Sequence, residues 1–310
     1  MPEAIDIQVL HELDQVAEKE LNRHLSIAKE WFPHEYVPWG QGRNFAFLGG
    51  EDWVPEDSKV SPESREALLV NLLTEDNLPG YHAAIANIMG REGAWGQWVH
   101  RWTAEENRHG IVIRDFLTVT RAIDPVLLER ARMQHMEIGY APDHGDKVLH
   151  GLAYVSFQEL ATRVSHRNTG KASGDELCEQ MMQRVAADEN LHMIFYRNLL
   201  GAAFEAFPNE AMKAITDVVK GFQMPGYTID GFLRKSVAIA NAGIYDLRLH
   251  HDDVLMPVLR KWGVFELEGL SDEGEKARIE LSEFLANLDA AATKFEERRE
   301  ARRARIAARA

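Results

Sequence analysis

Two short stretches of the sequence share one pattern, and they decide the fold: Glu105-Glu106-Asn107-Arg108-His109 and Asp188-Glu189-Asn190-Leu191-His192. Each contains Glu-x-x-His. Residues three apart on an α-helix lie on one face, so the carboxylate and the imidazole of each stretch can point at the same place. One such pair would indicate little, because glutamate and histidine are common on helix surfaces and a solvated pair is the ordinary explanation. Two such pairs in one chain call for a common cause.

Each motif has a partner carboxylate at a matching distance along the chain. Glu75 lies 31 residues before Glu106, and Glu159 lies 30 residues before Glu189. Ferritin-like bundles that bind two metal ions take one glutamate from each of two helices and Glu-x-x-His from each of the other two. The sequence therefore predicts an all-α protein with a ferritin-like four-helix bundle core and additional helices. Six expected metal ligands lie inside the bundle: Glu75, Glu106, His109, Glu159, Glu189 and His192.

The expected donor set favours a particular class of metal. Four carboxylates and two imidazoles are hard or borderline ligands that suit iron or manganese, and we expect iron. Cys178 is the only cysteine in the sequence, so a cysteine-rich zinc site, an iron–sulfur cluster or an intrachain disulfide lacks partner residues. Burying these ionisable groups without metal or partners would be costly. A metal-free set of buried Glu–His ion pairs remains the alternative.

Composition and charge exclude several classes of protein. The 310 residues are 45% hydrophobic and 27% charged, with a formal net charge of −14. Residues 296–310 hold six arginines against three glutamates, which leaves an acidic body that is a poor binder of nucleic acid. The arginine-rich end either contacts an acidic surface or, more simply, is a solvated helix end. No apolar stretch is long enough for a membrane span, and the first 14 residues carry acids where a signal peptide is basic. We therefore expect a cytoplasmic protein.

Helical periodicity dominates the sequence, and strand patterns are nearly absent. We expect helices over 7–25, 94–122, 147–167, 174–207, 209–222 and 229–246, one beginning at Ser61 and Pro62, and a last one from Asp272. Short polar links at 141–146 and 168–173 favour an antiparallel bundle. Pro79 should kink the helix of Glu75, because proline cannot donate a hydrogen bond to the Glu75 carbonyl. We expect a ferritin-like domain over 1–270 and a helical, arginine-rich tail over 271–310.

Beyond these patterns, three runs of the chain closely resemble the soluble acyl-carrier-protein desaturases, above all their actinobacterial branch. The runs are Trp102-Thr-Ala-Glu-Glu-Asn-Arg-His-Gly110, Phe157-Gln-Glu-Leu-Ala-Thr-Arg-Val-Ser-His166 and Ala187-Asp-Glu-Asn-Leu-His192. The likeness is strong over 31–196 and weaker beyond. It implies two iron ions in each chain, one bound by Glu75 and His109 and the other by Glu159 and His192. The glutamates of the two Glu-x-x-His motifs would bridge the ions.

The same resemblance implies roles for four residues outside the ligand set. Thr162 lies at the position of the family's active-site threonine, whose hydroxyl is thought to assist oxygen activation or proton delivery. Trp31 resembles the tryptophan that connects outward from the iron site through an aspartate, here Asp188, to a ligand histidine, here His109. Trp102 would form a wall of the acyl channel. Core packing would also explain the two tryptophans, and Asp188 could be an ordinary exposed residue.

The resemblance further implies an activity and partners. The activity is O2-dependent insertion of a cis double bond into a saturated fatty acyl chain on acyl carrier protein, in fatty acid biosynthesis. The chain has no G-x-G-x-x-G fingerprint, so electrons should come from a partner, a ferredoxin with its reductase. The family also implies a homodimer. Plant-type enzymes have basic residues where this chain has Asn190 and Leu191, so we expect carrier-docking charges elsewhere, with Arg163, Arg167 and Lys171 as candidates.

Three other functions fit the same metal motifs. A di-iron oxygenase would hydroxylate or N-oxygenate another substrate, an iron-storage cage would use shorter chains, and a catalytically silent paralogue would bind acyl carrier protein without turnover. A second apparent metal motif, His250-His251-Asp252-Asp253, carries less weight. Neighbouring residues on a helix point about 100° apart, so we expect a solvated face there.

Overall fold

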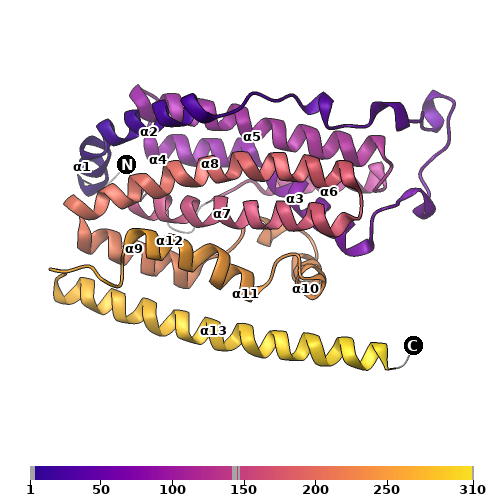
Figure 1. The fold of residues 1–310 in the computed structure, drawn as a ribbon. Coiled ribbons are helices and arrows are strands. Elements are labelled where there is room, and N and C mark those ends of the chain that lie inside the picture. Colours follow the sequence, from indigo (N-terminus) through magenta and orange to yellow (C-terminus); the bar gives the residue numbers. More distant parts are fainter. Residues whose placement is uncertain (1–3, 142–144, 146, 309–310) are drawn as a thin grey trace.

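The core of the protein is a bundle of four long helices. The computed structural model describes residues 4–141, 145 and 147–308, and within them the chain forms helices and no β-strand. The bundle helices pack against one another along the long axis of the molecule (Figure 1). They are α3 (Pro62–Asp76), α5 (Gly93–Val119), α7 (Val148–Ser173) and α8 (Glu176–Ala206). The all-α, ferritin-like prediction is confirmed, and no helix of the described residues is long and apolar enough to cross a membrane.

Further helices cover the bundle. The N-terminal ones, α1 (Ala4–Glu12) and α2 (Asp14–Ile27), lie at one end, where α2 packs against α5 and α8. The others are α4 (Leu78–Met89), α6 (Pro125–Ile138), α9 (Pro208–Gly221), α10 (Phe232–Ala242), α11 (Leu247–Leu249), the π-helix η6 (His250–Leu255), α12 (Met256–Trp262) and α13 (Asp272–Ala307). Short 3-10 turns are η1 (Pro33–Glu35), η2 (Trp39–Gln41), η3 (Ala46–Leu48), η4 (Pro55–Asp57) and η5 (Pro225–Thr228).

The connection between α7 and α8 is tighter than the sequence indicates. We expected a polar link over 168–173, and this was wrong, because α7 continues as a helix to Ser173. The turn consists of Gly174, with φ of 71°, and Asp175, whose carboxylate accepts a hydrogen bond from the Cys178 backbone N–H at 2.8 Å. Glycine ends the helix because it adopts a left-handed conformation without steric cost. The other expected link, 141–146, lies largely outside the described residues.

Pro79 separates two helices instead of kinking one. α3 ends at Asp76 and α4 begins at Leu78, with Pro79 as the second residue of α4. Proline suits the first turn of a helix, where its missing N–H has no intrahelical partner to lose. The interruption leaves Glu75 in the last turn of α3.

Two expectations for the C-terminal third need correction. The helix predicted over 229–246 is shorter, because Gly231 and Gly243 have φ of 67° and 79° and flank α10 on both sides. The His250 segment is a π-helix, and His250 is not solvated as expected. Its ring is partly buried, with Nδ1 2.8 Å from the Tyr245 hydroxyl.

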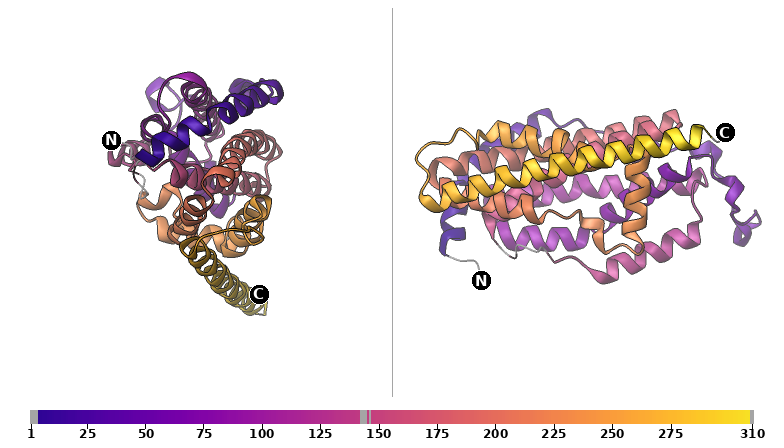
Figure 2. Two further views of the ribbon diagram at one scale, coloured as in Figure 1. Left: turned by 90° about the vertical axis from the view of Figure 1, so that its left-hand side faces the viewer. Right: turned by 90° about the horizontal axis from the view of Figure 1, so that it is seen from below.

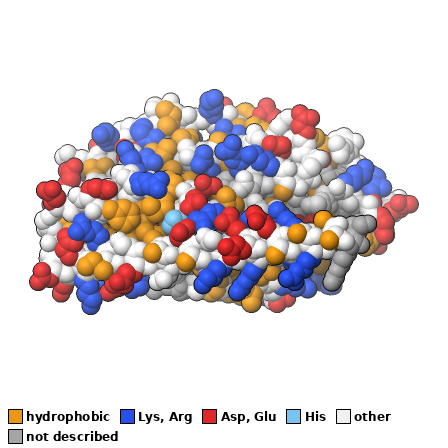
Figure 3. Space-filling model, turned by 60° about the horizontal axis from the view of Figure 1, so that its bottom comes forward, with side chains coloured by type: hydrophobic (Ala, Val, Ile, Leu, Met, Phe, Trp, Pro, Cys, Tyr) orange, Lys and Arg blue, Asp and Glu red, His pale blue; other side chains and the backbone are white. Residues whose placement is uncertain are grey.

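The last helix, α13, lies along the outside of the bundle (Figure 2) and packs mainly against α9. Its buried residues are Gly274, Ala277, Leu281, Leu285 and Ala292. Acidic and basic side chains are interspersed over this side of the molecule (Figure 3). Part of the arginine-rich end is bonded to the protein: Arg299 donates to the Ala240 carbonyl at 3.0 Å and Arg303 to the Asn241 carbonyl at 2.9 Å. The division of the chain at residue 270 stays a prediction.

A close approach of α7 and α8 depends on Gly170. A Cβ atom at this position would lie 2.9 Å from the Met182 Cβ and 3.0 Å from the Glu179 Cα. We expect Gly170→Ala to lower the free energy of unfolding by about 1–3 kcal/mol. This loss should exceed the stabilisation that alanine gains from its higher helix propensity. Gly221→Ala is the control, because nothing lies within 4 Å of its added Cβ. Urea unfolding of both variants measures the effect, and equal stability would contradict close packing at Gly170.

Candidate metal centre

The six expected ligands converge inside the bundle, each on the helix where its motif places it. Glu75 comes from α3, the first Glu-x-x-His from α5, Glu159 from α7 and the second motif from α8. All six side chains are buried, with at most 7% of their residue surface exposed. Their donor atoms form two groups in which every atom lies within 4.8 Å of the others, and Glu106 and Glu189 belong to both groups. This sharing matches two metal positions joined by two carboxylates.

The first group surrounds His109. Its Nδ1 lies 3.2 Å from Glu106 Oε2, 3.4 Å from Glu189 Oε1 and 3.7 Å from Glu75 Oε2. The imidazole therefore turns one nitrogen toward three carboxylates that come from three different helices. Such a cluster can hold one cation at the Glu75 side of the site.

The second group surrounds His192 in the same way. Its Nδ1 lies 2.7 Å from Glu106 Oε1, 3.6 Å from Glu159 Oε2 and 3.8 Å from Glu189 Oε2. Both ligand histidines thus present the same nitrogen, Nδ1, to the space between the helices. The equivalence follows from the repeated motif, because α5 and α8 place their Glu and His residues with the same spacing.

Several of these atoms have no hydrogen-bond partner among the described residues. They are buried, and they include Glu159 Oε2 and Glu189 Oε2. Unpaired buried polar atoms are rare in proteins because each costs desolvation energy. A cation beside them would satisfy both, and the oxygen and imidazole donors of the cluster suit a metal such as iron or manganese. The residues present fit a dimetal centre.

The pKa values of the two histidines reflect the excess of carboxylates. Burial alone would lower the pKa of His109, but the charge of Glu106 and the hydrogen bonds to Asp188, Glu106 and Glu189 raise it well above its ordinary value. The pKa of His192 is raised in the same way, with Glu106 again the main opposing charge. In the absence of metal, protons on these rings balance part of the buried negative charge.

The pKa values of two of the glutamates shift in opposite directions. Burial and the charges of Glu106 and Glu189 raise the pKa of Glu159 well above its usual range. Burial alone would raise the pKa of Glu189 as well, but hydrogen bonds with Glu159, His109 and other neighbours lower it far below that range. Like charges this close cannot all ionise together without a counter-ion. The protonation of the site is therefore coupled to whatever cation occupies it.

The tryptophan connection implied by the resemblance is present. Trp31 Nε1 donates to Asp188 Oδ2 at 2.7 Å, and His109 Nε2 lies 3.5 Å from the same oxygen. Asp188 is only 2% exposed, and Arg108 approaches the same oxygen at 3.2 Å. Asp188 is thus a buried partner of the ligand ring, not the exposed residue that was the alternative.

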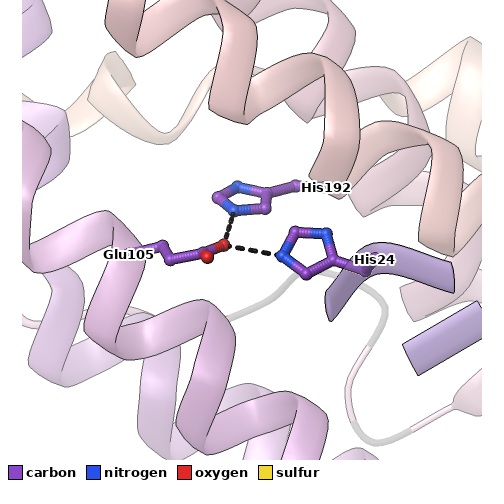
Figure 4. A group of neighbouring side chains, drawn as sticks. All are labelled: His24, Glu105 and His192. Carbon is purple, nitrogen blue, oxygen red and sulfur yellow. Dashed lines mark hydrogen bonds and ion pairs between the residues drawn. The ribbon is translucent and has the colours of Figure 1, made fainter. Parts of the chain in front are cut away.

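Two residues that the sequence analysis missed lie on the other side of the centre. Glu105 Oε2 is 2.9 Å from His192 Nε2 and 2.9 Å from His24 Nε2 (Figure 4). The two rings point at one carboxylate, and all three residues are buried. Glu105 could have been noticed, because it directly precedes Glu106 as Asp188 precedes Glu189. His24 carries no local pattern and could not.

His166 was also missed, although it lies within one of the runs that carry the resemblance. Its Nε2 is 2.9 Å from Glu75 Oε1 and 3.3 Å from Glu189 Oε1. Burial alone would lower the pKa of His166, but its hydrogen bonds to these two glutamates raise it to about 9. The signal available in the sequence was its spacing of seven residues from Glu159, which is two helical turns.

A largely apolar pocket opens onto the carboxylates. Its volume is about 650 Å³, including the part open to solvent, and its lining includes Glu75, Glu106, Trp102 and Thr162. The apolar part of the lining comes mainly from Leu78, Ile85, Ile88 and Val155. Trp102, expected as a wall of the acyl channel, and Thr162, expected as an active-site residue, therefore both line the pocket. Trp102 also donates a hydrogen bond to Glu159 Oε1 at 3.0 Å, so it contacts a candidate ligand.

The sequence of the chain also matches a known protein family. A sequence model of the family described as fatty acid desaturase matches residues 5–309. The chain belongs to this fatty acid desaturase family.

Relatives within the family are close. The desaturase chain is 53% identical over 298 residues to a Mycobacterium tuberculosis protein named as an acyl-[acyl-carrier-protein] desaturase, DesA1, covering 94% of this chain and 88% of that protein. It is 30% identical over 311 residues to the chloroplastic stearoyl-[acyl-carrier-protein] 9-desaturase of Spinacia oleracea, covering 94% and 76%. The X-ray structure of DesA2 from M. tuberculosis H37Rv, named in the same way, superposes with a TM-score of 0.70 at 31% identity, covering 83% of this chain and 95% of that one. The actinobacterial branch indicated by the sequence is supported.

Removing ligands from this desaturase should remove metal. We expect Glu106→Ala and His192→Ala to lose at least one of two bound ions, because Glu106 belongs to both groups and His192 supplies the imidazole of one. Metal analysis after anaerobic loading with Fe2+ measures the ratio of metal to protein. Glu20→Gln is a matched control, because Glu20 is a buried glutamate that pairs with Arg23 and Asn198 instead. Full loading of both alanine variants would refute the site.

Metal binding should also release protons. The raised pKa values of His109 and His192 mean that both rings are protonated in the metal-free protein at neutral pH. Each must lose a proton to bind metal, so uptake should release at least about two protons per chain. Affinity should rise as pH rises, because protons compete less well with the metal. Titration with metal in weakly buffered solution, followed by a pH indicator, measures the release, and a pH-independent affinity would contradict this protonation state.

Proposed function

We propose that the protein inserts a cis double bond into a saturated fatty acyl chain carried by acyl carrier protein, using O2. The observation that carries this proposal is the position of the pocket, whose largely apolar walls end at Glu75 and Glu106 of the buried cluster of candidate ligands. A flexible hydrocarbon chain suits such a pocket, because apolar lining gains from excluding water. The names of the relatives from M. tuberculosis and S. oleracea support the same substrate class.

The metal of this proposal is iron, with two ions in each chain. Glu75 and His109 would hold one ion and Glu159 and His192 the other, with the two shared glutamates between them. When bound, the iron supplies electrons that activate O2. The protein contributes a dry, fixed set of donors, since all six side chains are buried and come from four packed helices.

The electron balance of the reaction requires a partner. Removing two hydrogens from the acyl chain while reducing O2 to two waters needs two further electrons and two protons. The sequence has one cysteine and no dinucleotide fingerprint, so we propose a ferredoxin as donor. Trp31 and Asp188 lead outward from His109, and Phe32, next to Trp31, is 45% exposed. This is the route we assign to the incoming electrons.

The pocket residues have distinct roles in this proposal. Trp102 lines the pocket and also donates a hydrogen bond from Nε1 to one carboxylate oxygen of Glu159. Through this hydrogen bond it would orient the Glu159 carboxylate that holds the metal. The hydroxyl of Thr162 donates to the backbone carbonyl of Glu159 at 3.0 Å, one turn back on α7. A hydroxyl that can rotate from this carbonyl toward the pocket can pass a proton to the reacting oxygen.

Docking of the carrier protein on α7 stays a prediction. Arg163, Arg167 and Lys171 line a groove with Arg197 of α8, and none of the four forms an ion pair among the described residues. Their spacing of four residues puts the three α7 residues along one side of the helix, and this side is not the one that carries Thr162. The arm of a carrier docked here would have to pass around α7. We also propose a homodimer, which light scattering tests directly.

Mass spectrometry of the acyl chain tests the function. Iron-loaded protein is incubated with palmitoyl- or stearoyl-acyl carrier protein, O2, ferredoxin and its reductase. Loss of two hydrogens is the expected result. Gain of oxygen would favour the hydroxylase or N-oxygenase alternative instead. An unchanged chain in the presence of two bound irons would contradict these substrates and favour a silent paralogue.

Thr162 provides a sharper test of the chemistry. We expect Thr162→Ala to keep both metal ions, since its side chain touches no candidate ligand atom in the hydrogen bonds that it makes. Desaturation should fall by at least about tenfold, because the hydroxyl that delivers protons is lost. Thr162→Ser retains the hydroxyl and should recover most of the activity. Metal analysis and product formation are measured together, and equal activity of the alanine and serine variants would exclude the proton role.

A further inference from the structure

Each ligand histidine contacts an acidic residue that belongs to the opposite motif. The acid that precedes Glu189 is Asp188, and it contacts His109 of the first motif at 3.5 Å. The acid that precedes Glu106 is Glu105, and it contacts His192 of the second motif at 2.9 Å. In both cases the acid faces Nε2, while Nδ1 faces the metal site. Each helix therefore supplies a bridging glutamate to the centre and a carboxylate to the outer nitrogen of the opposite histidine.

Glu105 in turn is held by a residue from outside the four-helix bundle. His24 of α2 places its Nε2 2.9 Å from the same Glu105 oxygen that His192 contacts (Figure 4). The rings of His24 and His192 both pack edge-on against Trp98, with centroids 5.0 Å and 6.0 Å away. Trp98 and His24 are completely buried. The three side chains therefore have little room to reorient.

The charge on Glu105 determines the direction of these hydrogen bonds. Arg101 lies 2.5 Å from its other oxygen, and Arg108 lies 3.8 Å away. The ion pair with the Arg101 guanidinium favours the ionised form of the Glu105 carboxyl group. An ionised carboxylate can only accept hydrogen bonds. Both histidines must then donate from Nε2, so a neutral His192 keeps its lone pair on Nδ1.

We propose that Glu105 and His24 are positioning residues of the metal centre, which fix the tautomer and orientation of His192 so that Nδ1 is free to bind metal. The inference rests on the proposed dimetal site and concerns its Glu159–His192 half. Partners of a ligand's second nitrogen typically contribute 10- to 100-fold in metal affinity. The contact to His192, at 2.9 Å, is shorter than the 3.5 Å contact of Asp188 to His109, so this half of the site depends on its outer carboxylate at least as strongly.

Cobalt binding tests the proposal without turnover. Co2+ lies next to Fe2+ in the affinity series and reports its coordination by visible absorption. Wild-type protein should bind two ions and, in proton NMR, give two strongly shifted imidazole N–H signals that exchange with water, one from each ligand histidine. We expect Glu105→Leu to bind one of the two ions about 10- to 100-fold more weakly and to lose one of the two signals.

Matched variants separate positioning from simple loss of a buried acid. Glu105→Gln keeps an acceptor oxygen and should retain both signals, with faster exchange of one. Glu20→Leu removes a buried glutamate that does not contact His192, and it should leave cobalt binding unchanged. His24→Phe keeps a ring beside Trp98 but removes the second donor to Glu105, so it should weaken the same ion several-fold.

Several results would overturn the proposal. Glu105→Leu with two tightly bound ions and both signals would overturn the proposal, as would a helical variant that loses both ions equally. If Glu105→Leu does not fold, as judged by circular dichroism, His24→Phe decides. An unchanged exchange rate of the affected N–H in His24→Phe would overturn the role of the pair. Wild-type protein that binds fewer than two cobalt ions would contradict the metal centre itself and not this inference.

Discussion

The structure depends on the burial of four glutamates within a few ångströms of one another. Carboxylates at this distance repel, and an apolar interior gives them no water to spread the charge. Positive charge near the carboxylates offsets this repulsion. His166 pairs with Glu75, and the raised pKa values of the two ligand histidines keep protons on their rings. Each of these is a substitute for metal. The arrangement therefore favours a bound cation, because a metal would replace these protons and neutralise the remaining negative charge.

The helices are arranged to bring these charges together and keep water out. Gly170 allows α7 and α8 to pack closely. The break at Pro79 sets where α3, the helix of Glu75, ends. α13 takes no part in the centre and covers the opposite side of α9. The fold thus separates the bundle that carries the candidate metal ligands from an outer helix that carries none of them.

The sequence predicted the centre better than its surroundings, for a physical reason. A ligand pair on one helix obeys the three-residue spacing, and a repeated pair with matched upstream glutamates is unlikely to arise by chance, so all six positions could be named. His24 lies on a separate helix and meets the centre only through tertiary packing, which no local pattern records. The link at 168–173 was misjudged because its polar residues suggested a loop, although packing against α8 keeps them helical.

The position of these outer residues divides the molecule into two sides. Most of the pocket lining comes from α3, α4, α5 and α7, so the proposed acyl substrate would reach the centre from that side. His24 and Trp31 come from the N-terminal segment and meet the acids Glu105 and Asp188 on the other side. One segment of eight residues, from His24 to Trp31, therefore contacts both outer carboxylates. A displacement of this segment would remove a contact from both outer carboxylates at once, so the N-terminal segment would contribute to metal affinity together with the ligands Glu75 and Glu106 that line the pocket.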